Sequence, residues 1–126
     1  MNTTYFTIAA LIAAGFMFLR LQGFGSGISS ISSKDAKALK NDQGADVVFL
    51  DVRTTREVQQ GKIKNSKNID VMSSDFKQKV DRLDKSKTYV VYCRSGQRSM
   101  RAAKQMKALG FEKIFNLSGG FMRWSN

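Results

Sequence analysis

One short stretch of this chain combines a thiol, two guanidinium groups and a glycine: Cys93-Arg94-Ser95-Gly96-Gln97-Arg98-Ser99. It follows an apolar run, Tyr89-Val90-Val91-Tyr92, and precedes a segment with helical spacing, which is where open α/β sheets place their ligands. Backbone N–H groups at a helix N-terminus favour a negative charge, and so do the two arginines. The glycine lets the backbone close around an anion. We therefore predict that the pKa of Cys93 is lowered, that it is largely thiolate at neutral pH, and that the loop binds an anionic group.

The rest of the composition limits which other chemistry the chain can perform. The 126 residues contain no histidine, no proline and one cysteine. The absence of histidine excludes Ser-His-Asp and Cys-His catalytic devices and every histidine-ligated metal site. A single cysteine forms no disulfide within the chain and no cysteine-rich zinc site. We therefore expect neither a metal nor a cofactor. A lone cysteine after a strand is often just a small buried hydrophobe, but the two arginines and the glycine favour a reactive thiolate.

The chain is strongly basic, with 21 Lys and Arg against 10 Asp and Glu and a net charge of +11. Such an excess attracts small oxyanions, anionic lipid headgroups or nucleic acid. The compact Lys/Arg run that marks a nucleic-acid-binding arm is missing, so we expect no nucleic-acid partner.

The N-terminal residues are typical of a membrane anchor. No charge precedes Arg20, and Tyr5 to Leu19 is almost entirely apolar and long enough, as a helix, to cross a bilayer. We predict an anchor over residues 1–21 and a Gly/Ser linker over residues 22–30. A cleaved signal peptide and a buried helix remain as alternatives. Because the nearest cations all follow the span, the positive-inside rule predicts a single-pass protein whose catalytic domain faces the cytoplasm.

Residues 31–126 alternate between strand-length apolar runs and helical segments, which predicts an α/β domain with a small, mostly parallel sheet flanked by helices. We predict strands at 47–50, 89–92 and 114–115 and a short extended stretch around Ile69. Capping pairs and apolar spacing predict helices at about 32–41, 54–61, 74–83 and 99–109, with Ser74 as a candidate cap for the third. Asp51 and Arg53 follow the first strand, where an ion pair supporting the site is expected. Arg53 and Glu57 are spaced to pair across one helical turn.

Four motifs in this order resemble those of the rhodanese-homology family. They are Asp51-Val52-Arg53 with Glu57, Gly61-Lys62-Ile63 with Asn68-Ile69, the Cys93–Arg98 loop, and Leu117-Ser118-Gly119-Gly120 with Trp124. Lys62 stands where the family usually has histidine, and Lys64 where proline is common. Neither position carries sulfur in the family mechanism.

The resemblance implies a sulfurtransferase in which Cys93 takes sulfane sulfur from thiosulfate or a persulfide and passes it to a thiol. The residues implied to hold the substrate are Arg94, Ser95, Gly96, Gln97, Arg98 and Ser99. Small sulfur-containing anions, thiols and a protein sulfur donor or acceptor are the implied partners. Two other functions remain open: a phosphatase, although the family's phosphatase-like members use a loop one residue longer, and a non-enzymatic sulfur carrier or binding module at the membrane.

Overall fold

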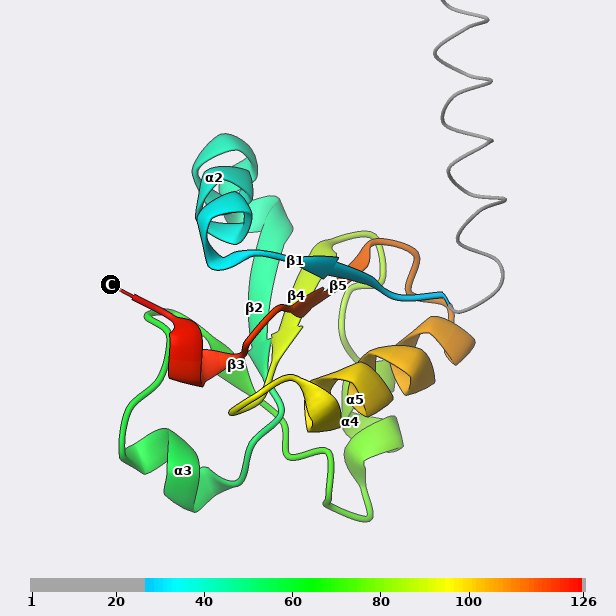
Figure 1. Cartoon of the computed structure of the whole chain (residues 1–126). Helices are drawn as coiled ribbons and strands as arrows, with labels where there is room; N and C mark the ends of the chain where they lie inside the picture. The colour runs from blue at the N-terminus through cyan, green and yellow to red at the C-terminus, as the bar shows by residue number, and fades with distance from the viewer. Residues whose placement is uncertain (1–26, 126) are drawn as a thin grey trace, which may run out of the picture.

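The computed structural model describes residues 27–125, which contain one five-stranded sheet in the order β1-β5-β4-β2-β3 (Figure 1). Every pair of neighbouring strands is parallel. The strands are β1 (Ser29–Ile31), β2 (Val47–Asp51), β3 (Lys67–Asn68), β4 (Thr88–Tyr92) and β5 (Ile114–Leu117). The predicted α/β class with a parallel sheet is confirmed.

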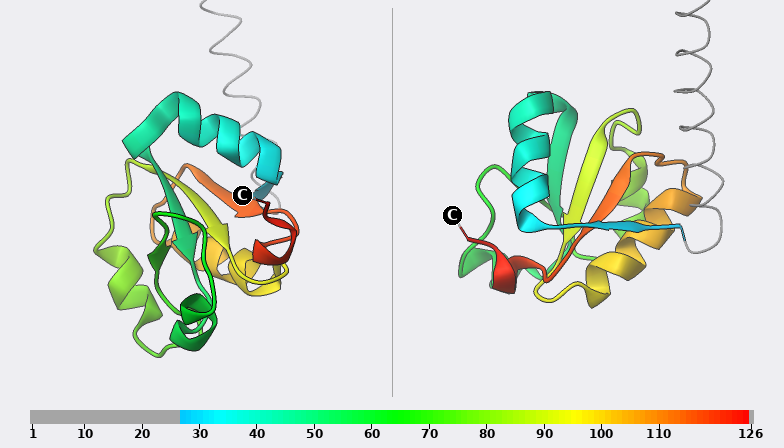
Figure 2. Two further views of the ribbon diagram at one scale, coloured as in Figure 1. Left: turned by 90° about the vertical axis from the view of Figure 1, so that its left-hand side faces the viewer. Right: turned by 45° about the horizontal axis from the view of Figure 1, so that its top comes forward.

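Helices cover both faces of this sheet, so the domain has three layers (Figure 2). One face carries α2 (Ser33–Gln43) and the short 3₁₀ helix η2 (Phe121–Arg123), and the other carries α4 (Phe76–Asp81) and α5 (Gln97–Ala108). Two smaller elements, η1 (Gly44–Asp46) and α3 (Thr55–Gln59), flank β2 in the sequence.

The central strand β4 explains the layering. All five of its residues are buried, and successive side chains point to opposite faces of the sheet. Tyr89, Val91 and Cys93 pack in the cluster beneath α4 and α5, whereas Val90 and Tyr92 pack with residues of α2 and η2. The position of Cys93 on the α5 side therefore follows from its register in β4.

Helix capping places the helix starts. The Ser32 hydroxyl accepts the Asp35 N–H, and the predicted capping box of Thr54 and Glu57 is present at α3. The prediction that Ser74 caps the following helix is wrong: Asp75 occupies that position and makes no side-chain capping bond. The next helix, α5, starts at Gln97, two residues earlier than predicted, because Gly96 at φ 117° turns the loop directly into the helix.

The first strand was not anticipated from the sequence. Ser29, Ser30 and Ile31 pair with Phe115, Asn116 and Leu117, so the sheet includes the last two residues of the stretch predicted as a linker. Among residues 27–125, no helix has the length and apolar character needed to cross a membrane. The predicted anchor over residues 1–21 lies outside the described residues.

Candidate active site

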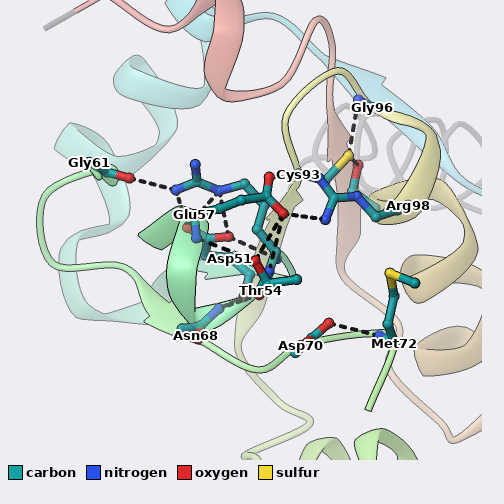
Figure 3. Close-up of polar contacts among 12 residues, drawn as sticks. Asp51, Thr54, Glu57, Gly61, Asn68, Asp70, Met72, Cys93, Gly96 and Arg98 are labelled. Carbon is teal, nitrogen blue, oxygen red and sulfur yellow. Dashed lines mark hydrogen bonds and ion pairs between the residues drawn. The ribbon is translucent and has the colours of Figure 1, made fainter. Parts of the chain in front are cut away.

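Cys93 lies immediately after β4, at the carboxyl edge of the parallel sheet, and its sulfur is surrounded by the loop that follows it. The Gly96 N–H donates to Sγ at 3.1 Å, and the Ser99 hydroxyl oxygen lies 3.3 Å from Sγ (Figure 3 shows the first contact). Cys93 is only 1% exposed. Backbone N–H groups of the loop and of the start of α5 thus surround a sulfur that is almost completely buried.

This surrounding stabilises the thiolate. Burial raises the pKa of the Cys93 thiol, but hydrogen bonds from the Ser99 side chain and from the backbone of Ser99, Gly96 and Ser95 outweigh burial, so the pKa lies below its ordinary value. The lowered pKa agrees with the sequence prediction. Of the predicted causes, the backbone N–H groups of the loop act on the sulfur, and the Ser99 side chain adds a hydrogen bond that the sequence did not indicate.

Replacing Ser99 with alanine is expected to raise the pKa of Cys93 and to slow its alkylation at pH 7 by about tenfold. A hydrogen bond to a charged group is worth about 1.5 kcal/mol or more, and the alanine variant loses one. The measurement is the rate of iodoacetamide alkylation against pH. Ser95→Ala is the matched control, because its exposed side chain can be removed while its backbone N–H stays. Equal pH profiles for Ser99→Ala and the wild type would contradict the assignment.

Arg98 forms a two-point ion pair with Glu57. Its Nη1 and Nη2 donate to Oε1 and Oε2 at 2.7 and 2.9 Å (Figure 3). The hydrogen bond from Arg98 lowers the pKa of Glu57 to about 2. The predicted pairing of Arg53 with Glu57 is wrong, because Arg53 pairs with Asp51 instead. Arg98 therefore ties the start of α5 to α3. Two of its N–H donors are already bound to Glu57 and are not available to a substrate anion.

A Glu57→Gln variant is expected to lose about 1 kcal/mol of unfolding free energy at pH 7, because the pair is partly exposed. Glutamine retains the capping contact at α3, so the change isolates the ion pair. Because the pKa of Glu57 falls from 4.5 to about 2 on folding, its contribution is complete above pH 4.5 and is lost as the pH falls toward 2. Urea unfolding at pH 7 and at lower pH measures this. If the difference in unfolding free energy between the variant and the wild type stayed constant with pH, the ion-pair interpretation would be refuted.

Asp51 and Arg53 form a buried ion pair next to the site. Arg53 Nη2 lies 2.7 Å from Asp51 Oδ2 and also donates to the Gly61 carbonyl at 2.7 Å. The guanidinium lies 4.4 Å from the centre of the Phe121 ring. Since the Phe121 N–H donates to the Cys93 carbonyl at 2.8 Å, this pair supports the segment on which the active-site loop rests.

The contact between η2 and the loop requires a glycine. Gly120 has φ 61°, and a Cβ there would lie 2.5 Å from the Arg94 carbonyl oxygen. Because Gly120 has no Cβ, the Met122 N–H can donate to the Arg94 carbonyl at 3.0 Å. The Arg94, Ser95 and Gln97 side chains are exposed, so the structure brings Gly96 and Ser99 to the sulfur but leaves these three at the surface of the loop.

Sequence reasoning missed Asn116. Ser99 Oγ lies 2.5 Å from Asn116 Oδ1, and Asn116 Nδ2 donates to the Gly96 carbonyl at 3.2 Å. Asn116 thus fixes both residues that contact the sulfur. The available signal was one buried amide in the otherwise apolar strand Ile-Phe-Asn-Leu, since a buried polar side chain in a strand needs partners.

The comparison with known protein families agrees with this geometry. Residues 32–126 match the family described as rhodanese-like domain. The chain belongs to the rhodanese-like domain family. The rhodanese-like domain here is 39% identical, over 89 residues, to a protein of Bacillus subtilis named putative sulfurtransferase YtwF, covering 69% of this chain and 84% of that protein.

Two other similarities are to a solved structure and to a much longer protein. A rhodanese-related protein from Thermoplasma volcanium has a solved structure with a TM-score of 0.64 and 32% identity, covering 76% of this chain and 89% of that one. A tRNA uridine(34) hydroxylase of Cytophaga hutchinsonii is 37% identical over 91 residues, which are 70% of this chain but only 28% of that protein. The relatives named as sulfurtransferases support a general sulfur-transfer role for the domain.

Proposed function

We propose that this chain is a sulfurtransferase that carries sulfane sulfur as a persulfide on Cys93. The observation that supports this most directly is the sulfur at the end of β4, where it accepts the Gly96 N–H and contacts the Ser99 hydroxyl at the start of α5. These groups stabilise a negative charge on Sγ, so the nucleophile is ionised without a general base.

In the first step, the Cys93 thiolate attacks the outer sulfur of thiosulfate or of a donor persulfide. A new S–S bond forms at Sγ, and the bond between the two donor sulfurs breaks. With thiosulfate, sulfite leaves with the bonding electron pair, so no oxidant or reductant is consumed. Arg94 is exposed on the loop and attracts the anionic donor, while Arg98 adds a weaker attraction because it is paired with Glu57.

In the second step, an acceptor thiolate attacks the outer sulfur of the Cys93 persulfide. The acceptor becomes a persulfide, and Cys93 leaves as a thiolate that the loop already stabilises. The chain has no second cysteine, so the persulfide cannot collapse into an internal disulfide. Gly96, Ser99 and the N–H groups around them would hold the terminal sulfur anion during the interval between the two steps.

The test is the intact mass of the full chain after incubation with thiosulfate, followed by peptide mapping. We expect a gain of one sulfur atom on the peptide that contains Cys93, and its loss on adding cyanide, which accepts sulfane sulfur as thiocyanate. No gain from thiosulfate or from a persulfide donor would overturn the proposal. A stable gain that no thiol or cyanide removes would favour the carrier module over the enzyme.

We also propose that residues 1–21 anchor the chain in a membrane, that a short linker follows, and that the domain, which begins with β1 at Ser29, faces the cytoplasm. The support is the uncharged apolar run of the sequence and the cations that follow it. The tagged chain is expected to stay with membranes through alkaline carbonate extraction. Protease should cleave a C-terminal tag only after the cells are opened. Release by carbonate would remove the anchor, and cleavage on intact cells would reverse the orientation.

A further inference from the structure

The reactive sulfur is recessed, so whatever exchanges sulfur with it must seat against the surrounding surface. Cys93 is 1% exposed, and a persulfide extends the reactive atom by only one S–S bond of about 2 Å. A small thiol can enter the loop unaided. A cysteine on a protein reaches the sulfur only when the protein surface around it fits the rim of the site.

That rim carries an unusual pair of apolar side chains. Within residues 27–125, the exposed large hydrophobic side chains are Met72 and Met122, at 67% and 63% exposure. Both border the Cys93 loop. The Met122 N–H donates to the Arg94 carbonyl at 3.0 Å. The side chain of Met72 lies on the side of the site that holds Arg98 (Figure 3).

Two exposed methionines from separate segments at one site are more than scattered surface hydrophobes. Methionine has a flexible, polarisable side chain, and such residues are common where a surface must adapt to a partner. A partner that covers these side chains buries apolar surface without removing a polar group from water, so the contact is favourable.

The rim is also cationic. Neither α5 nor η2 contains an acidic residue in its first turn, and the loop from Cys93 to Gly96 has none. Arg94 is exposed on the loop, and its carbonyl accepts the Met122 N–H. The carboxylates of the neighbouring segments are all partnered: Glu57 pairs with Arg98, Asp70 accepts the Met72 N–H at 2.9 Å, and Asp75 pairs with Lys79 at 3.3 Å. A complementary partner is therefore acidic.

We propose that Met72, Met122 and Arg94 form a docking rim for a protein sulfur acceptor whose cysteine lies among acidic and apolar residues. This rests on the proposed persulfide function and names its partner class. The partner's cysteine thiolate attacks the outer sulfur of the Cys93 persulfide, the bond from that sulfur to Sγ breaks, and Cys93 leaves as the thiolate. A membrane surface is a poorer occupant, because it would cover the opening that the sulfur must use.

The first test measures binding and needs no sulfur chemistry. The probes are the fluorescent peptide Glu-Glu-Leu-Ser-Leu-Glu-Glu and its counterpart with lysine at every glutamate position, titrated with the full chain and with Cys93→Ser. We expect the acidic peptide to bind about tenfold more tightly than the basic one, and M72S/M122S and R94E each to weaken the binding of the acidic peptide about tenfold. Lys113→Glu is the matched control for charge, because Lys113 is exposed at the opposite, amino-terminal edge of the sheet.

Equal binding of the acidic and basic peptides, or equal weakening by Lys113→Glu, would overturn the docking rim. Binding of the chain to phosphatidylglycerol vesicles that is lost in M72S/M122S, with no binding of the acidic peptide, would assign the rim to a membrane instead. These results hold whether or not Cys93 accepts sulfur, so they separate the failure of the rim from the failure of the persulfide function.

The second test measures transfer from the loaded Cys93 persulfide to the acidic peptide with cysteine in place of serine, and to free cysteine. In M72S/M122S, transfer to the peptide is expected to fall about tenfold, while transfer to free cysteine is unchanged. Equal slowing with both acceptors would show that the methionines affect the chemistry and not the docking, and would overturn the proposal.

Discussion

A Cys93→Ser variant is expected to transfer sulfur at about one thousandth of the wild-type rate or less, with both thiosulfate and persulfide donors. The thiolate is the nucleophile, and a serine hydroxyl is neither ionised at neutral pH nor able to hold sulfane sulfur in a stable bond. The chain has no other cysteine that could substitute. The measurement compares the rates at which the variant and the wild type, at equal concentration, form thiocyanate or the acceptor persulfide.

The same substitution is expected to leave the fold in place. Serine has nearly the shape of cysteine, and its oxygen can accept the Gly96 N–H and contact Ser99 as Sγ does. We expect the unfolding free energy to change by no more than about 1 kcal/mol. Sulfur transfer retained by a folded Cys93→Ser variant would mean that the reaction does not pass through Cys93.

The strands that carry the site were predictable because their signals are local and strong. The apolar run at 47–50 and the run at 89–92 lie within β2 and β4, which are buried on both faces of a parallel sheet. The capping box of Thr54 and Glu57 was also predictable, since both of its residues lie in one turn. From these elements, the position of Cys93 at the carboxyl edge follows directly.

The partner of Glu57 was not predictable, because it depends on how distant segments fold together. The position of Asp51 and Arg53 after the first strand predicted their ion pair, which forms. Helical-turn spacing favoured Glu57 with Arg53, but Glu57 pairs with Arg98, 41 residues away. Arg53 is turned inward by its contact with the Phe121 ring, which comes from the end of the chain. No local pattern contains that information.

The first strand and Asn116 illustrate two other limits. Ser29 to Ile31 is too short and polar to be recognised as a strand and is extended only because β5 pairs with it. The role of Asn116 depends on Ser99 and Gly96 reaching it from the loop. The chemistry of the cysteine was visible in the sequence, whereas the network that positions it was not.

Removing the Asp51 carboxylate is expected to destabilise the described domain strongly. Asp51 is fully buried, and in an Asp51→Ala variant the Arg53 guanidinium, 5% exposed, would lose its counter-charge. Breaking a buried pair in this way costs about 3–5 kcal/mol of unfolding free energy. Chemical unfolding monitored through Trp124 fluorescence measures the loss. Asp81→Ala is the matched control, because Asp81 pairs with Lys85 at the surface and should change the free energy by less than about 1 kcal/mol.

The cost of Asp51→Ala has a specific origin that a second change isolates. The loss comes mainly from the unpaired charge, so replacing Arg53 with methionine in the same variant should recover part of it, about 1 kcal/mol or more. The double variant keeps apolar bulk against the Phe121 ring, and with it the support for the Cys93 carbonyl. If the double variant were as unstable as the sum of both single changes, the ion pair would not be the source of the stability. Recovery would show that the pair is needed as a unit beneath the active-site loop.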